Sequence, residues 1–155
     1  MRSRILRGSA FLLCCLLLAG CAWLGDHPRA VAFTARYIDL QVGYRDDFGY
    51  PQKQIVTTKE QLDNTYAEEF VQDYNEDFFK SHCLVVVYLA EPTWSIDHEV
   101  TAVTREKETL NVYLKRLPPA GLDGEMERPW LVIVELPSGL PDNLILWIAT
   151  VPKPT

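Results

Sequence analysis

The sequence predicts an α+β domain with a mostly antiparallel β-sheet of about seven strands and one or two N-terminal helices packed on it. Short apolar or alternating segments recur between turn-forming residues from position 31 to position 151, as is typical of strands. One helical pattern with a capping signal follows residue 57. The run at residues 84–89 is apolar throughout, which indicates a strand that is buried on both faces.

The domain begins with a predicted strand over residues 31–43. Its apolar side chains form two sets that are out of phase, which indicates a bulge or a change of face. Residues 44–52 carry turn-forming residues and three aromatic side chains, and residues 54–57 predict a short second strand. The two sets in the first strand are Phe33, Ala35 and Tyr37, and Ile38, Leu40 and Val42.

Thr58 begins the predicted helix, because Thr58 and Gln61 have the spacing of a capping box. Residues 75–82 predict one further helical turn, in which Phe78 and Phe79 face the core. The apolar stripe of the first helix consists of Leu62, Tyr66, Phe70 and Val71.

The later strands are separated by turn-forming residues. Pro92 ends the strand at residues 84–89, two alternating segments joined at residues 105–108 predict a hairpin, and residues 118–127 predict a loop. The strands after Pro92 are expected at residues 96–104, 109–117, 130–136 and 144–151. In the first of these, Ile96, His98, Val100 and Ala102 share the predicted inward face.

The N-terminal segment has the layout of a secretory signal. Three arginines precede an apolar run at residues 10–18, which is about half the roughly 20 residues that a membrane-spanning helix needs. The next residues, Leu18-Ala19-Gly20-Cys21, resemble the bacterial lipobox, in which the cysteine is acylated and the chain is cut just before it. This resemblance implies a signal peptide at residues 1–20, lipid attachment at Cys21, a lipidated tether at 21–30 and one domain at 31–151. An ordinary signal peptide or a retained short apolar helix is the alternative.

Processing at this point would place the protein outside the cytoplasm, anchored by lipid to the cell membrane or the outer membrane. The full chain has a net charge of −6, and loss of the three signal arginines would make it −9. This charge argues against nucleic acid as a partner and against a surface that lies along anionic lipid. Cys83 would be the one remaining unmodified thiol, so no internal disulfide is expected.

Catalytic signals are few, and no enzymatic activity, cofactor or metal is predicted. His27 lies in the tether, and the spacing of the histidines and Cys83 does not fit a metal site. His82 and Cys83 are adjacent, and in a strand they would point to opposite faces, which disfavours a catalytic pair. His98 falls on an inward face, where it is either a buried, hydrogen-bonded histidine or a cleft residue.

Aromatic residues near the predicted loops are the candidates for partner binding, because tryptophan, tyrosine and arginine often dominate protein interfaces. Trp94 follows the central strand, and Trp130 begins a later one. The alternative for both is that they cap the ends of the core. The full set of candidates is Trp94, Trp130, Arg128, Thr93, Tyr44, Phe48 and Tyr50.

Two motifs carry a resemblance to a known domain. Glu76-Asp77-Phe78-Phe79 leads into the apolar strand at residues 84–89, and Pro129-Trp130 leads into another at residues 131–134. This order is similar to that of the PrcB C-terminal-like domain of small bacterial lipoproteins. The family's Thr-Gly-Gly-Tyr loop is replaced here by Thr93-Trp94-Ser95-Ile96, which puts any role of a glycine loop in doubt. The family name implies a stabilising subunit beside a surface protease complex.

A second resemblance is to the chagasin-like inhibitors of cysteine proteases. Glu91-Pro92-Thr93 and Arg128-Pro129-Trp130 are similar to two loops that those immunoglobulin-like proteins insert into a protease cleft. The predicted helix and the missing glycine loop do not fit that family.

The sequence therefore predicts a lipid-anchored, extracytoplasmic module that binds a protein, such as an accessory or stabilising subunit of a surface protease or envelope assembly. Two further functions stay open, a chagasin-like inhibitor and a lipoprotein that binds a small ligand or an envelope polymer.

Overall fold

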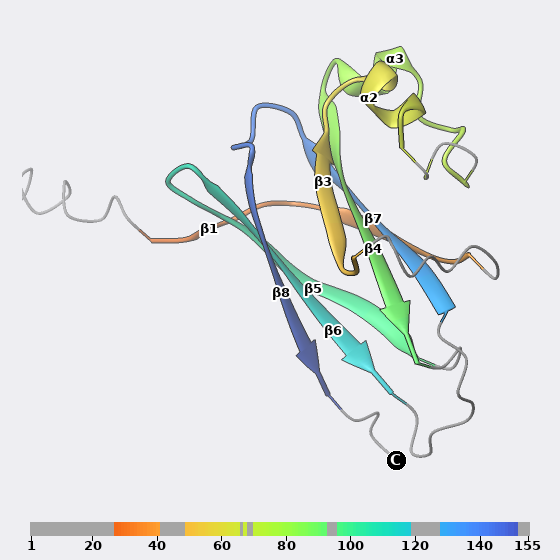
Figure 1. Cartoon of the computed structure of the whole chain (residues 1–155). Helices are drawn as coiled ribbons and strands as arrows, with labels where there is room; N and C mark the ends of the chain where they lie inside the picture. The colour runs from red at the N-terminus through yellow and green to blue at the C-terminus, as the bar shows by residue number, and fades with distance from the viewer. Residues whose placement is uncertain are drawn as a thin grey trace, which may run out of the picture.

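Two four-stranded sheets pack face to face in the computed structural model of the chain (Figure 1). Their strand orders are β1-β5-β6-β8 and β2-β7-β4-β3. The structure describes residues 27–40, 49–65, 67, 70–92, 96–118 and 128–151. The elements are β1 (Arg29–Ala30), β2 (Thr34–Asp39), β3 (Gln52–Val56), α2 (Lys59–Asp63), α3 (Glu76–Phe79), β4 (His82–Glu91), β5 (Asp97–Glu106), β6 (Thr109–Leu117), β7 (Arg128–Pro137) and β8 (Asn143–Thr150).

This architecture confirms a β-rich domain with mostly antiparallel pairing and two short helices, but the prediction of one sheet is wrong. The strands divide between two sheets, and β8 pairs with β6 in parallel. The connection from β6 to β8 can be parallel because β7 crosses to the other sheet between them. Local patterns do not report this partition, since a sandwich strand and a single-sheet strand have the same period.

The central strand β4 is buried on both faces, as its composition predicts. Val85, Val87 and Leu89 face the other sheet, where they pack against residues of β5 and β6. Leu84 and Val86 face the opposite way, toward the segment that contains α2 and α3. The helical segment therefore covers the outer face of the β2-β7-β4-β3 sheet.

The two apolar phases of the first predicted strand correspond to these two faces. Phe33 and Ala35 pack between the sheets, and Ile38 and Leu40 pack under the helical segment. The chain also changes sheet here, because β1 pairs with β5 and β2 pairs with β7. The expected continuous strand over residues 31–43 is therefore replaced by β1 and β2, with residues 31–33 between them.

The first helix is shorter than predicted, because α2 ends at Asp63. Thr58 caps it as expected by accepting a hydrogen bond from the Gln61 backbone N–H at 3.1 Å. Gln61 Oε1 reaches back to the Thr57 N–H at 2.7 Å. At the other end the Asn64 side chain donates to the Glu60 carbonyl, a local bond that competes with continuation of the helix. Ala67 and Val71 are nevertheless buried against the sheet, and Tyr66 lies outside the described residues.

The hairpin of β5 and β6 forms across the predicted turn, with one change of phase. A register shift between Val100 and Ala102 turns Val103, instead of Ala102, into the core. The Tyr37 hydroxyl accepts a hydrogen bond from the Val100 N–H at 2.7 Å next to this shift. Within the described part of the chain, no helix is long and apolar enough to cross a membrane.

Candidate functional site

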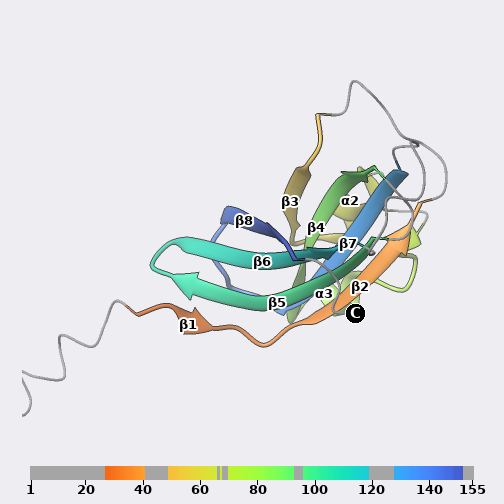
Figure 2. The same cartoon turned by 90° about the horizontal axis from the view of Figure 1, so that it is seen from below.

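Several strands begin or end together at one end of the sandwich, which we call the loop end. Asp39, the last residue of β2, is opposite Trp130 of β7, and Glu91, the last residue of β4, is opposite Arg128. The β5–β6 turn lies at the other end, and Figures 1 and 2 show this separation from two directions. The described strand ends that flank residues 41–48, 93–95 and 119–127 therefore lie side by side at the loop end.

A buried polar cluster lies just inside the loop end and joins the two sheets. We call Glu91, His98, Arg116 and Trp130 the Glu91 cluster. The Glu91 side chain is 1% exposed and that of His98 is fully buried. His98 Nε2 donates to Glu91 Oε1 at 2.9 Å, and Arg116 Nε lies 2.9 Å from both carboxylate oxygens. A second contact joins Arg116 Nη2 to Glu91 Oε2.

This geometry compensates a carboxylate that burial would otherwise make costly. Both oxygens of Glu91 accept charge-assisted hydrogen bonds, and Arg116 reaches solvent with about a quarter of its side chain. The Trp130 ring lies against the His98 ring with centroids 4.9 Å apart. The cluster therefore fixes the ends of β4, β5, β6 and β7 relative to one another.

Two buried nitrogens of the cluster have no hydrogen-bond partner among the described residues. They are His98 Nδ1 and Trp130 Nε1. Because the His98 ring is fully buried, its Nδ1 does not open to solvent in this arrangement. The described residues contain no group of three or more His, Cys, Asp or Glu side chains that could hold a metal ion.

The predicted binding residues fall into two groups. Trp130 is half-buried and packs against the core between the sheets, and Arg128 Nη1 lies 3.3 Å from Asp39 Oδ2. Tyr50 is half-buried against the outer core of the β2-β7-β4-β3 sheet. The other predicted residues lie outside the described part of the chain: Cys21, Tyr44, Phe48, Thr93 and Trp94.

The adjacent pair of His82 and Cys83 points to opposite faces, as expected. His82 stacks on Phe78 at 5.0 Å, and its Nδ1 lies 2.8 Å from the Ser81 hydroxyl. Cys83 is buried between the sheets, and this burial, with a smaller contribution from Asp142, raises the pKa of its thiol. A raised pKa lowers the thiolate fraction, so this thiol is poorly suited to nucleophilic chemistry.

The sequence analysis did not predict the roles of Glu91 and Arg116 in the buried cluster. Glu91 continues the inward alternation of Val87 and Leu89 in β4, so its parity is the signal that could have found it. Arg116 likewise continues the inward positions of β6.

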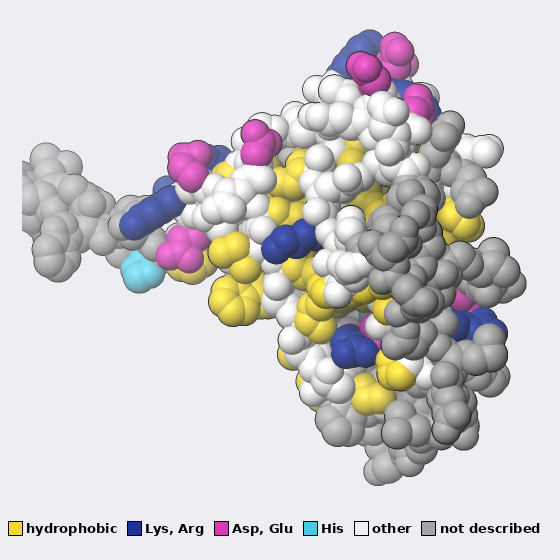
Figure 3. Space-filling model, in the orientation of Figure 1, with side chains coloured by type: hydrophobic (Ala, Val, Ile, Leu, Met, Phe, Trp, Pro, Cys, Tyr) yellow, Lys and Arg dark blue, Asp and Glu magenta, His cyan; other side chains and the backbone are white. Residues whose placement is uncertain are grey.

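Hydrophobic side chains gather on part of the face seen in Figure 3. Trp147 of β8 is 52% exposed. Its Nε1 donates to Asn111 Oδ1 at 3.0 Å, and its ring stacks on that of Tyr113. Other exposed apolar residues in this part of the chain are Ile145 and Ile148 of β8 and Val151, which follows it.

Comparison with known proteins gave no match to a family model, to a curated protein or to a solved structure. The residues and their geometry therefore carry the functional proposals.

Proposed function

We propose that this protein is a lipid-anchored, extracytoplasmic domain that binds a protein partner through its loop end. The single observation that carries the proposal is the convergence of strand ends at Asp39, Glu91, Asp97 and Arg128. This convergence brings together the ends of the segments that hold Tyr44, Phe48 and Trp94. Residues far apart in sequence can thereby contribute to one surface.

The Glu91 cluster supports this function because it makes the base of the loops rigid. Binding loops on a fixed scaffold lose less conformational entropy when a partner binds. Aromatic and arginine side chains of the kind found in these segments carry much of the energy in protein interfaces.

The position of the N-terminal strand supports the proposed anchor. β1 lies beside the β5–β6 turn, at the end opposite the loop end (Figure 1). A chain that is tethered through Cys21 would therefore present the loop end away from the membrane. This orientation suits an accessory or stabilising subunit of a surface protease or envelope assembly.

In-cell crosslinking of the anchored protein, followed by mass spectrometry, tests this function. We expect one dominant partner, with crosslinks from residues 93–95 and 119–127. Trp94→Ala should weaken its binding by about 2 kcal/mol, roughly thirtyfold, without changing the free energy of unfolding. Trp147→Ala is the matched control, since Trp147 lies on β8. Equal affinity of Trp94→Ala and the parent protein, or a loss only in Trp147→Ala, would contradict the assignment to the loop end.

A second candidate is a chagasin-like inhibitor of cysteine proteases, and the two-sheet architecture favours it over a lipoprotein that binds a small ligand or an envelope polymer. Glu91 is opposite Arg128, and Ala90 is opposite Pro129, so the two inhibitor-like motifs begin side by side. An inhibitor should slow a papain-like protease in a direct assay, and Trp94→Ala should reduce that effect. Full activity of the protease in a large molar excess of the protein would exclude this candidate.

A further inference from the structure

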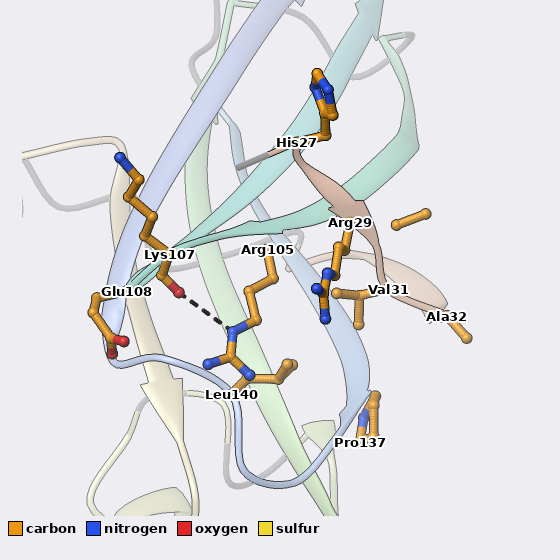
Figure 4. A pocket seen from close by; sticks show the side chains of 10 residues that line it. His27, Arg29, Val31, Ala32, Arg105, Lys107, Glu108, Pro137 and Leu140 are labelled. Atoms are coloured by element: carbon orange, nitrogen blue, oxygen red, sulfur yellow. Dashed lines mark hydrogen bonds between the residues drawn. The ribbon is translucent and has the colours of Figure 1, made fainter. Parts of the chain in front are cut away.

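A partly open cavity of about 690 Å³ lies at the end of the sandwich opposite the loop end (Figure 4). Its walls come from β1, from the turn between β5 and β6, and from the segment after β7. Its lining includes two arginines, Arg29 and Arg105. It also includes apolar side chains, among them Val31, Pro137 and Leu140. We call this cavity the arginine pocket.

The two arginines are direct cross-strand neighbours, because Arg29 of β1 is opposite Arg105 of β5. Like charges in this position repel each other and destabilise the pairing. Among the described residues, neither guanidinium has a carboxylate within ion-pair distance. The pairing would therefore be stabilised by an anion that both side chains could contact.

The geometry of the side chains fits such an anion. Arg105 Nε donates to the Lys107 carbonyl oxygen at 3.3 Å, which holds the guanidinium in place. Figure 4 shows the guanidinium groups of Arg29 and Arg105 extending to the same side, toward Leu140. Glu108 also lines the pocket, and no ion pair joins it to either arginine.

The combination of charge and apolar surface narrows the ligand class. Planar guanidinium groups match the oxygens of phosphate, and the apolar lining suits a hydrocarbon group attached to it. The protein as a whole is acidic, with a net charge of −6, so its overall charge repels anions. The basic character of this pocket is therefore a local feature. A phosphate that carries an apolar portion fits these features better than a free inorganic anion.

We propose that the arginine pocket binds the phosphate of an anionic phospholipid headgroup. Arg29 is eight residues after Cys21, a length that reaches at most roughly 28 Å when extended. The choice of a membrane lipid as the source rests on the proposed anchor, whereas the affinity for phosphate rests on the pocket alone. Binding of one headgroup is compatible with an acidic protein, because it needs only a local site.

The test uses the full chain purified in a non-ionic detergent. Its probes are dihexanoyl phosphatidylglycerol, dihexanoyl phosphatidylcholine and inorganic phosphate, and the measurement is deuterium uptake of peptides that cover β1 and residues 104–109. We expect phosphatidylglycerol to slow uptake in these peptides, and 0.5 M NaCl to reduce this effect. Arg29→Gln or Arg105→Gln should raise the apparent Kd about tenfold, as loss of one charge-assisted hydrogen bond would.

Lys53→Gln, at an exposed position of β3, is the matched charge control and should bind like the parent protein. Arg29→Lys keeps the charge and should retain part of the binding. It replaces Arg29→Gln in the test if that variant does not fold. Unchanged uptake with phosphatidylglycerol, or equal losses in Lys53→Gln, would overturn the proposal. Equal binding of inorganic phosphate would overturn the lipid as the source. Crosslinking of the partner at the loop end should persist in Arg29→Gln, so failure of one proposal is distinguishable from failure of the other.

Discussion

Glu91 in β4 and Arg116 in β6 form an ion pair that crosses from one sheet of the sandwich to the other, with Arg116 Nε 2.9 Å from both carboxylate oxygens. The pair lies where the core between the sheets meets the loop end, so it joins the two sheets at this end of the sandwich. Its value depends on both partners, because a buried charge without its counterpart retains the desolvation cost and loses the attraction.

Replacement of Glu91 by alanine should lower the free energy of unfolding by about 3–5 kcal/mol, because it leaves Arg116 and the buried His98 ring without their acceptor. Urea unfolding measures this change. Asp77→Ala is the control, since the Asp77–Lys80 pair is exposed and should contribute about 1 kcal/mol or less. A loss below about 1 kcal/mol in Glu91→Ala would show that the cluster does not stabilise the fold.

The stability of the protein should decrease between pH 10 and pH 12 through Tyr74. Burial raises the pKa of Tyr74 to about 12, and the hydrogen bond to Glu135 makes a smaller contribution in the same direction. The folded state therefore favours the neutral phenol, and this contribution is complete below pH 10 and is lost as the pH rises through 12. It amounts to at most about 3 kcal/mol.

Chemical unfolding across this pH range measures the effect, and Tyr74→Phe should remove it. Tyr113→Phe, in β6, is the control and should keep the alkaline decrease. The assignment to Tyr74 is wrong if both variants lose stability with the same pH profile as the parent protein.

Cys83 should react with iodoacetamide much more slowly in the native protein than in the unfolded one. Its side chain is buried, and burial raises the pKa of the thiol, so both access and thiolate fraction are reduced. Mass spectrometry of the peptide that contains Cys83 separates its labelling from that of the other cysteines. Equal labelling rates in native and denaturing buffer would contradict the buried position.

Leu62→Ala should cost about 2–5 kcal/mol of unfolding free energy, although α2 has only five residues. Leu62 is fully buried against the outer face of the β2-β7-β4-β3 sheet, so its removal leaves a cavity there. Lys59→Ala on the same helix is the control, because the ion pair of Lys59 with Asp63 is a surface one. Similar losses in the two variants would contradict the conclusion that packing of Leu62 against the sheet stabilises this segment.

Cys21→Ser tests the proposed anchor directly. We expect the substitution to abolish the mass increase from acyl chains and to reduce the membrane-bound fraction, since two or more buried acyl chains make a firm anchor. Intact-mass measurement and membrane fractionation give the two readouts. An unmodified Cys21 in the parent protein would contradict lipid attachment.

Local patterns were sufficient for the helix cap and for most strands, but not for the predicted strand at residues 31–43, which the structure divides into β1 and β2. The turn at residues 105–108 and the hydrogen bond from Gln61 to Thr58 depend on neighbours in sequence, so they could be predicted from a few residues. The length of α2 could not, because a polar side chain at Asn64 ends the helix within an otherwise helical apolar pattern.

Assembly of the sheets and of the candidate site needed information that periodicity does not contain. The alternation in β4 and β6 is compatible with inward positions for Glu91 and Arg116, but it does not say that the strands belong to facing sheets. The 25-residue separation of the pair is closed only by the tertiary fold. The phase change at Phe33 and Ile38 likewise acquired a meaning only once the two cores were known.

The small size of β1 has a mechanical consequence. β1 is joined to β5 by two register pairs, whereas β2 is joined to β7 by six. A tensile force applied through the N-terminal segment would reach β1 first and peel it from the sheet while β2 still held. Detachment of β1 would add the residues up to 33 to the length of the extended tether. The domain could therefore extend under force without unfolding its core. The same event would separate Arg29 from Arg105, and tension would thereby open the arginine pocket and release its ligand.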